Sequence, residues 1–367
     1  MIHYIVGRNL GHLSRCVANV KKFNQISDQK VKVFAFKHSH SWLRSNLPKA
    51  KIRSFSKEKL KDKTKNFLKA KLIMHDWRKE VEWLKKERGK KGPVIGGIYH
   101  SEMFTTREDS DWTTKFKHEI HDVSEKTTDI FFHMNLLPPY RTPKLSTFYV
   151  PIPIISRKVS MSPQKVRKVL GLKSSEPFIL IHMGGGVGPF RYKYMDEWYD
   201  RLMKVRTPYR MVVANQFGGV RRKFPKSVIQ APLFPNGPDL INAAELVISK
   251  PGMGIMIDCI TTGTPLLSLP ADSKEREVKN MMLQDLTNNP LCIASKKTSV
   301  HHLSRQIRSL LDQSQLIKQS FQQVPCNGAE VVAKCMKKLS RISLEDLPDA
   351  YPEILRLSPF DMQHTKR

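Results

Sequence analysis

Short apolar runs rich in β-branched residues alternate with helical patterns along most of this chain. The apolar runs lie at 2–6, 31–36, 94–98, 129–134, 178–183, 210–214, 246–248, 265–269 and 291–294. Patterns typical of helices lie between many of them, at 11–24, 56–88, 163–171, 194–205, 253–262 and 275–286. Strands that alternate with helices predict parallel sheets covered by helices on both faces. The expected fold class is therefore α/β.

A proline-containing stretch near the middle of the chain predicts a domain boundary. Pro151 and Pro153 break regular structure at 148–154, and a new helix and strand follow from about residue 162. A chain of 367 residues is long enough for two domains. We expect two Rossmann-like, doubly wound domains at 1–150 and 155–340, and a C-terminal extension at 341–367. Such sheets bind ligands at the carboxyl ends of their strands.

The loop after the first strand carries the first candidate site. Gly7 and Gly11 permit a tight turn, and the following helix presents its positive end to an anion. His12 stands at the start of that helix, where a neutral imidazole can take a proton from a hydroxyl group or from water. Arg15 follows one turn later. The alternative is a surface histidine and a solvated arginine. The loop is not a dinucleotide-binding fingerprint, because its third glycine is missing.

The strand at 178–183 runs into a glycine-rich loop. Four glycines lie within five positions, beginning with Gly184, Gly185 and Gly186. The backbone amides of such a loop can approach a phosphate, whereas the alternative is a flexible turn. No Gly-Lys-Ser/Thr follows, so the loop is not a Walker A motif.

A second loop in this half joins the strand at 246–248 to the helix at 253–262. Its Ser-Lys-Pro-Gly-x-Gly sequence contributes Ser249, Lys250, Gly252 and Gly254, and the helix start again faces an anion. Asp258 lies one to two turns into this helix, where its carboxylate can bridge ribose hydroxyls. The next helix begins with three further donor-side candidates, Arg276, Glu277 and Asn280.

The stretch 245–280 resembles the donor-binding domain of the family-28 glycosyltransferases. The match runs through Ser249, Lys250, Gly252, Asp258, Gly263, Pro265, Pro270 and Asn280. The first loop resembles the amino-terminal Gly-x-Gly-His segment of this family, and its Gly-His-x-x-Arg form is also similar to a related sugar-nucleotide hydrolase. The family usually has Glu at the position of Asp258, and Gln where Arg276 and Glu277 stand.

The resemblance implies a GT-B fold, with two domains facing a cleft, and a nucleotide-sugar donor, most often a UDP-sugar, bound mainly by the second domain. By position, the glycines 184–186 would line the phosphates, Asp258 would hold the ribose, and the turn 276–280 would approach the sugar. His12 would be the catalytic base. No cofactor and no metal ion are implied.

The charge of the chain is strongly positive and unevenly distributed. The formal net charge is +30, and residues 1–100 hold 25 basic and 7 acidic residues. Such a half favours nucleic acid, an anionic membrane surface or a phosphorylated substrate as a partner. Residues 56–91 predict a basic helix with an apolar stripe through Leu60, Phe67 and Val81, which suits a membrane interface; the alternative is a core-facing helix. No nucleic-acid reader module is recognisable.

The remaining signals concern location and the acceptor side. No apolar run is long enough to span a membrane, and five cysteines without a CxxC pair favour a cytoplasmic protein, or one peripheral on the inner face of a membrane. His100 and Glu102 end a strand and are acceptor-side candidates, together with Gly11 and Arg15. Asp109-Ser110-Asp111 spells a metal-binding motif of another fold, but we interpret it as a surface turn.

These observations predict a metal-independent, inverting transfer of a sugar from a nucleotide sugar to an acceptor hydroxyl. The expected partners are the nucleotide sugar, a lipid-linked or other anionic acceptor, and an anionic membrane surface. One alternative is a hydrolase of the same donor. Another is a non-catalytic protein that binds nucleic acid or a membrane surface on the same scaffold.

Overall fold

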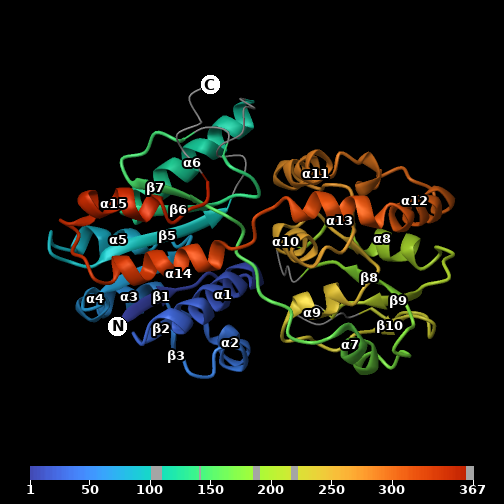
Figure 1. The fold of residues 1–367 in the computed structure, drawn as a ribbon, viewed down its shortest axis with the longest axis horizontal. Coiled ribbons are helices and arrows are strands. Elements are labelled where there is room, and N and C mark those ends of the chain that lie inside the picture. Colours follow the sequence, from blue (N-terminus) through green and yellow to red (C-terminus); the bar gives the residue numbers. More distant parts are fainter. Residues whose placement is uncertain (101–109, 140–141, 185–190, 216–221, 361–367) are drawn as a thin grey trace. The chain divides into compact units, whose positions relative to one another are not determined.

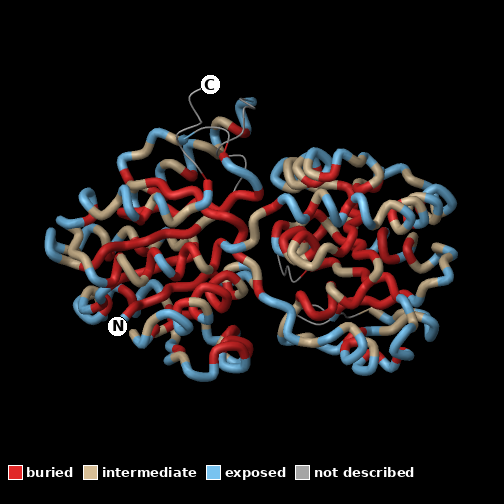
Figure 2. The backbone as a smooth tube through the Cα atoms, in the orientation of Figure 1, coloured by how far each residue is buried: buried red, intermediate tan, exposed pale blue. Residues whose placement is uncertain are grey.

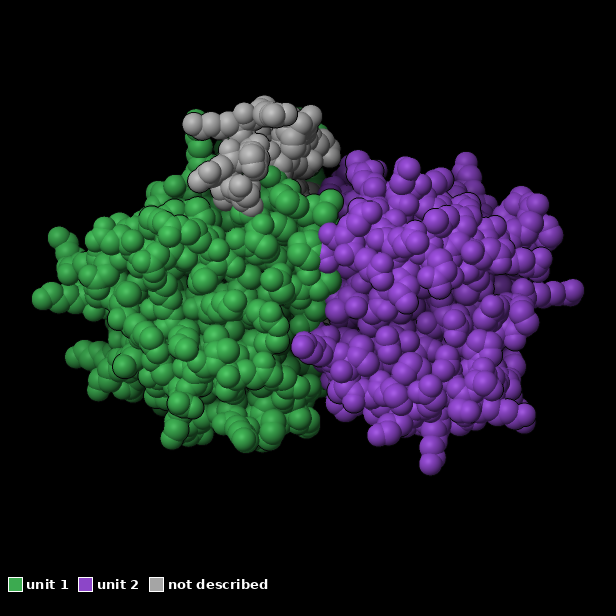
Figure 3. All heavy atoms as spheres, viewed as in Figure 1, with its two compact units in different colours: residues 1–156, 325–367 green, residues 157–324 purple. Residues whose placement is uncertain are grey.

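The computed structural model describes residues 1–100, 110–139, 142–184, 191–215 and 222–360. The chain forms two compact units (Figure 3). Unit 1 combines Met1–Ser156 with Pro325–Arg367, and unit 2 is the continuous stretch Arg157–Val324. Within the described ranges, no helix has both the length and the apolar character needed to cross a membrane.

Unit 1 is built on seven parallel strands in the order β3-β2-β1-β4-β5-β6-β7 (Figure 1). The strands are β1 (Ile2–Ile5), β2 (Val31–Ala35), β3 (Lys51–Ser54), β4 (Leu72–Asp76), β5 (Val94–His100), β6 (Ile130–Met134) and β7 (Phe148–Ile152). The chain winds outward from β1 in one direction and from β4 in the other. The carboxyl ends of β1 and β4 therefore flank the switch point at which such sheets hold ligands.

The helices of unit 1 bury the two faces of this sheet. They are α1 (Leu10–Ile26), α2 (His40–Asn46), α3 (Lys57–Asp62), α4 (Thr64–Leu68), α5 (Val81–Glu87), α6 (Asp111–Thr127), α14 (Gly328–Leu339) and α15 (Leu347–Leu355). On one face, Ile5 and Ile73 of the sheet share a core with Leu60 and Phe67 from α3 and α4. Strands of both units are largely buried (Figure 2).

Unit 2 repeats this plan with five parallel strands in the order β10-β9-β8-β11-β12. The strands are β8 (Phe178–His182), β9 (Arg210–Val213), β10 (Ile229–Gln230), β11 (Leu246–Ser249) and β12 (Leu266–Ser268). The helices are α7 (Pro163–Val169), α8 (Met195–Leu202), α9 (Gly237–Asn242), α10 (Met253–Thr262), α11 (Lys274–Thr287), α12 (Val300–Asp312) and α13 (Ser314–Gln322). The switch point lies between β8 and β11. The α/β class with two Rossmann-like domains is thus confirmed.

Two predictions of secondary structure were wrong. The stretch 56–88 is not one helix, because it contains α3, α4, the central strand β4 and α5. Its supposed apolar stripe, including Leu60 and Phe67, is buried in the core rather than exposed to a membrane. The run 291–294 is not a strand: Pro290–Cys292 form a 3₁₀ turn, and Ile293 makes a single bridge to Ser268.

The C-terminal helices belong to unit 1, whereas the sequence-based division placed everything from 155 to 340 in the second domain. α14 packs against α1, and Lys22 pairs with Glu330. The Tyr351 hydroxyl of α15 donates to the Tyr149 carbonyl oxygen of β7 over 2.6 Å. The chain approaches so closely here that a Cβ on Gly328 would stand 2.0 Å from the Pro153 carbonyl oxygen. The local sequence of a helix does not reveal which core its apolar face covers.

Candidate active site

Three side chains meet at the switch point of unit 1. The Asp76 carboxylate at the end of β4 accepts hydrogen bonds from Arg15 Nε at 2.9 Å and from Arg15 Nη2 at 2.7 Å. Nδ1 of His12 lies 2.6 Å from Asp76 Oδ1. Helix α1 supplies His12 and Arg15 one turn apart, and β1 and β4 are neighbours in the sheet. The structure therefore brings the two predicted residues His12 and Arg15 together on the carboxylate of Asp76, which the sequence pattern did not indicate.

The charge on Asp76 fixes the tautomer of His12. Burial alone would raise the pKa of Asp76, but the Arg15 guanidinium and His12 outweigh burial and hold this pKa well below its usual range. Because the ionised carboxylate can only accept, we assign the proton of the 2.6 Å contact to His12 Nδ1. Arg15 Nη2 lies 2.9 Å from the same nitrogen and then donates to Asp76 Oδ1 rather than to His12. Nε2 then keeps its lone pair and can act as a base.

The two members of the His12–Asp76 pair differ in their exposure to solvent. The Asp76 side chain is fully buried, whereas 19% of the His12 side chain is exposed. A buried carboxylate that orients a partly exposed imidazole is the arrangement that supports general-base catalysis. The site can therefore take a proton from a hydroxyl group or from water.

Gly7 leaves the space that the His12 ring occupies. A Cβ on Gly7 would lie 2.7 Å from His12 Cγ and 2.8 Å from Cδ2. Gly7→Ala should displace the imidazole and lower kcat about 10²-fold, because misplacing a catalytic group by about 1 Å costs that much. Gly11→Ala is the matched control, since its Cβ would meet only Arg15 Nη1, at 4.0 Å. Equal activity of the two variants would contradict this account of Gly7.

The other acceptor-side candidates predicted from the sequence are His100, Glu102 and Gly11. His100 ends β5, two strands from β1, and Glu102 lies outside the described residues. Gly11 is exposed in the first turn of α1. Asp109 also lies outside the described residues, while Ser110 caps α6 by accepting a hydrogen bond from the Thr113 amide. Among the residues that the structure describes, no three His, Cys, Asp or Glu side chains gather as a metal-ion site.

In unit 2, Gly184, just after β8, lies beside Lys250, just after β11. Gly184 has a φ of +77°, and a Cβ there would stand 2.6 Å from Lys250 Cε. The pKa of Lys250 is lowered to about 8, first by burial and then by the neighbouring cations Arg276 and Lys279. Lys250 stands beside Gly184 and has Arg276 and Lys279 near it, so this is the place in unit 2 that suits a polyphosphate.

The Arg276 side chain is held in place by the fold. Its guanidinium pairs with Asp272, whose carboxylate is almost fully buried. Asp272 Oδ2 also accepts a hydrogen bond from the Lys193 amide over 2.8 Å. Arg276 is thus a cation that Asp272 fixes in the neighbourhood of Lys250.

Several residues that were predicted to bind the sugar donor form hydrogen bonds within unit 2. Ser249 Oγ donates to the His182 carbonyl oxygen over 2.6 Å. Asn280 accepts from Ser268 Oγ over 2.6 Å and donates to the Leu269 carbonyl oxygen over 3.0 Å, so both of its amide atoms serve the fold. Gly252 is the N-cap residue of α10, Gly254 is exposed, and Gly185 and Gly186 lie outside the described residues.

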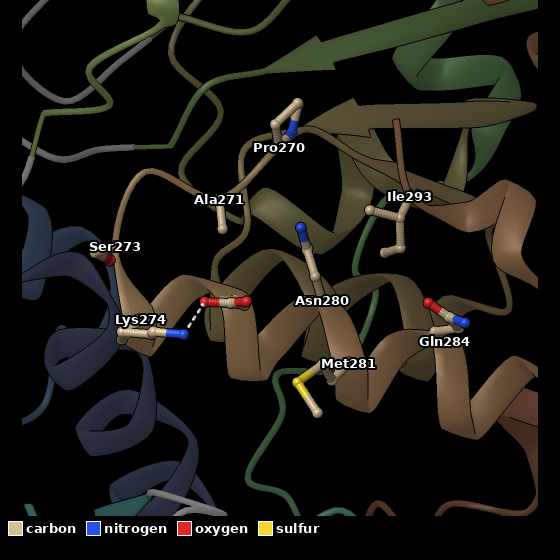
Figure 4. A pocket seen from close by; sticks show the side chains of 9 residues that line it. Pro270, Ala271, Ser273, Lys274, Asn280, Met281, Gln284 and Ile293 are labelled. Carbon is tan, nitrogen blue, oxygen red and sulfur yellow. Dashed lines mark ion pairs between the residues drawn. The ribbon is translucent and has the colours of Figure 1, made fainter. Parts of the chain in front are cut away.

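A hollow of about 520 Å³ lies beside the start of α11. Pro270, Ser273 and Met281 are among its lining residues (Figure 4). Glu277 also lines it and pairs with Lys274 over 2.9 Å. The hollow therefore adjoins the segment that was predicted to approach the sugar.

Asp258 lies in a different group of side chains from Lys250. It faces the start of α9, where its Oδ2 would be 3.7 Å from a Cβ on Gly237 and Arg157 Nη2 would be 3.3 Å from the same atom. Burial raises the pKa of Asp258 to about 6, and the Arg157 cation opposes that rise. The carboxylate is thus mostly ionised at neutral pH and can accept hydrogen bonds from hydroxyl groups.

Comparison with known proteins gives similar structures but no similar sequences. No family model matches the chain, and no curated protein does. The structure is similar to that of Phytolacca americana UGT2, which was solved with UDP-2-fluoro-glucose and pterostilbene (TM-score 0.65, 12% identity, 93% of this chain and 98% of that one). It is also similar to the spinosyn forosaminyltransferase SpnP (0.62, 11%, 93% and 99%) and to Acinetobacter baumannii MurG (0.54, 14%, 92% and 99%). At these identities the likeness shows the fold alone: the chain has the two-domain, Rossmann-like GT-B fold of these glycosyltransferases.

Proposed function

We propose that this protein transfers a sugar from a nucleotide sugar, most simply a UDP-sugar, to an acceptor hydroxyl with inversion and without a metal ion. The buried carboxylate of Asp76 on the imidazole of His12, at the switch point of unit 1, carries the proposal. The same fold in proteins named as glycosyltransferases supports the reaction class. A bound UDP-sugar analogue in one of them favours a UDP donor.

In the proposed reaction His12 acts on the acceptor. Its Nε2 takes the proton as the acceptor O–H bond breaks, and the oxygen forms a bond to the anomeric carbon. The bond from that carbon to the diphosphate breaks, and its electron pair leaves with the nucleotide. Asp76 stabilises the imidazolium that forms, because the carboxylate stays ionised beside it.

The leaving diphosphate needs positive charge, which unit 2 can supply. Arg276 and Lys279 lie close enough to Lys250 that their charges lower its pKa, against the opposing effect of Asp272 and Glu275. Preorganised cations of this kind stabilise developing negative charge without reorganising during the reaction. Asp258 would contribute through the ribose hydroxyls, as the resemblance to family 28 implies.

The first experiment screens UDP, GDP and TDP sugars by thermal shift, with and without EDTA. A ligand at about 100 times its Kd stabilises the protein by about 2.7 kcal/mol. We expect a shift with one nucleotide sugar that EDTA does not change, followed by transfer to an acceptor. Sugar release without any acceptor would instead identify a hydrolase, and the absence of a shift with every nucleotide would contradict the proposal.

The affinity for UDP should fall as the pH rises from 7 to 9. Lys250 loses its proton near pH 8, and with it a charge-assisted hydrogen bond worth about 1.5–3 kcal/mol, or about 10- to 100-fold in Kd. Calorimetric titration of UDP across this pH range measures the effect. The Lys250→Ala variant should bind UDP weakly at every pH, whereas the control Lys204→Ala, at an exposed position of unit 2, should keep the wild-type pH dependence. A flat wild-type profile would contradict this role of Lys250.

A basic segment of unit 1 supports an anionic surface as a further partner. Nine exposed cations and two exposed acids lie between residues 51 and 71. The pKa of Lys32, on the neighbouring strand, is lowered by burial and then by the cations Lys51 and Arg53. Since the apolar side chains of this region face the core, the proposed contact with a membrane is electrostatic rather than an insertion.

Vesicle binding tests this partner. Each basic residue near an anionic membrane contributes about 1 kcal/mol, so replacing Lys57, Lys61 and Lys65 by Gln should weaken binding to phosphatidylserine vesicles about 100-fold. The control replaces the exposed lysines 173, 204 and 297 of unit 2. Equal binding to neutral vesicles, or preference for a competing oligonucleotide, would overturn the membrane proposal.

A further inference from the structure

Trp77, the residue directly after Asp76, has a backbone conformation that is unusual for its type. Its φ is +51°, in the left-handed region that glycine and asparagine adopt far more readily than a bulky side chain. Among the described residues, Asn288 is the one other non-glycine residue with a positive φ. Strained backbone next to a reactive side chain persists where the surrounding structure enforces it, and such strain gathers at functional sites.

Aromatic stacking holds the Trp77 ring. The ring lies flat on Tyr99 of β5, with centroids 4.0 Å apart and planes 16° apart, and it also contacts Phe131 of β6 at 6.2 Å. Both partners belong to or pack on the core beneath α6. Asp76 points to the face covered by α1, while Trp77 is anchored on the opposite face. The stack therefore offsets the strain of the left-handed turn.

A buried histidine, His75, forms hydrogen bonds that hold the same turn. The Arg78 amide donates to His75 Nδ1 over 3.1 Å, and His75 Nε2 donates to the Thr127 carbonyl oxygen over 3.2 Å. Burial lowers the pKa of His75 to about 4, so the ring is neutral and can accept and donate at once. Gly97 leaves room for this, since a Cβ there would be 2.9 Å from His75 Nε2.

These contacts fix the chain on both sides of Asp76. If residue 77 had an extended backbone, the strand would continue past Asp76. The Arg78 amide would then lose His75 as its hydrogen-bond acceptor. We propose that Trp77 is a positioning residue, whose left-handed backbone, held by the Tyr99 stack, ends β4 so that the Asp76 carboxylate stays on His12 Nδ1. The inference rests on the proposed function only for its effect on the reaction rate.

A pair of substitutions separates backbone positioning from simple packing. Trp77→Ala removes the stack but keeps the steric cost of a Cβ at positive φ, so the turn should relax and His12 should lose its partner. Trp77→Gly also removes the stack, but glycine adopts this φ freely and should retain the turn. If the ring acted only by filling space, glycine would be as harmful as alanine or worse. Trp77→Asn should behave like Trp77→Gly.

The readout is the proton position on His12. Selective ¹⁵N-histidine labelling reports the fraction of His12 that carries its proton on Nδ1, with the signals assigned by their loss in His12→Gln. Asp76→Asn gives the value for a broken pair. We expect Trp77→Ala to approach that value and to lose at least 10-fold in kcat, whereas Trp77→Gly keeps the wild-type tautomer. Equal tautomer fractions in the two variants would overturn the proposal.

Two features keep this test decisive. Tyr99→Leu removes the stack and leaves Trp77 in place, so it should reproduce Trp77→Ala even if that variant does not fold; a wild-type tautomer in Tyr99→Leu would overturn the proposal. The tautomer is measured without any substrate. A failure of glycosyl transfer would therefore leave the positioning result intact, and the two failures can be told apart.

Discussion

Asp76→Asn is expected to lower kcat about 10²- to 10⁴-fold while UDP binding is retained. The neutral amide no longer fixes the proton on His12 Nδ1, and it no longer stabilises the imidazolium that forms when His12 takes the acceptor proton. His12→Ala should cost a similar factor, and the double variant should lose little more than either single one, because the two residues act as one unit. Steady-state rates with the donor found by the screen, together with UDP titration, measure these effects.

Asp129→Asn is the matched control for this experiment. Asp129 is also a buried carboxylate of unit 1, paired with Arg88 and bonded to the Ile95 amide over 2.7 Å. Its loss should lower stability but leave kcat per folded molecule near the wild-type value. Similar falls in kcat for both variants would show that Asp76 matters only for folding, and the proposed role of the His12 pair would be lost.

Arg15→Met is expected to destabilise unit 1 by about 3–5 kcal/mol, because it leaves the Asp76 carboxylate buried without its main counter-charge. Arg15 is 5% exposed and Asp76 is fully buried, so water cannot replace the lost guanidinium. Adding Asp76→Asn should recover part of the loss, since it removes the uncompensated charge. Urea unfolding of the single and double variants measures the difference.

An exposed ion pair provides the comparison for Arg15. Lys79 and Glu119 pair over 2.8 Å, with side chains that are 62% and 54% exposed. Lys79→Met should therefore change stability by less than about 1 kcal/mol. If Arg15→Met were as mild as Lys79→Met, the buried pair would not hold β4 to α1, and its role would have to be limited to the chemistry of His12.

Local patterns in the sequence were sufficient to find the loops but not all of their partners. His12, Arg15 and Lys250 were predicted because each follows a recognisable apolar strand. Asp76 was missed because β4 stands among lysine-rich helical patterns, so its apolar residues were interpreted as a helix stripe. A fully apolar run, Leu72-Ile73-Met74, that ends in a polar pair was the signal that could have revealed the strand.

The sequence also could not show which polar side chains form hydrogen bonds within the fold and are therefore not free to bind a ligand. Asn280 matched a donor-binding motif, yet Ser268 and Leu269 engage its amide. Ser268, at the end of β12, and Leu269, directly after it, lie twelve and eleven residues earlier than Asn280, and only the folded chain brings them together. Likewise, the positive φ of Trp77 has no sequence signature, because a tryptophan is among the residues least expected there.

The discontinuous course of unit 1 has a consequence for synthesis on the ribosome. Unit 2 is encoded without interruption and is complete once residue 324 has emerged, whereas the first 156 residues wait for α14 to cover α1. Domains of nascent chains ordinarily fold in order from the N-terminus. For this chain we expect the reverse order: unit 2 can finish folding first, while α1 and its glycine loop wait for α14.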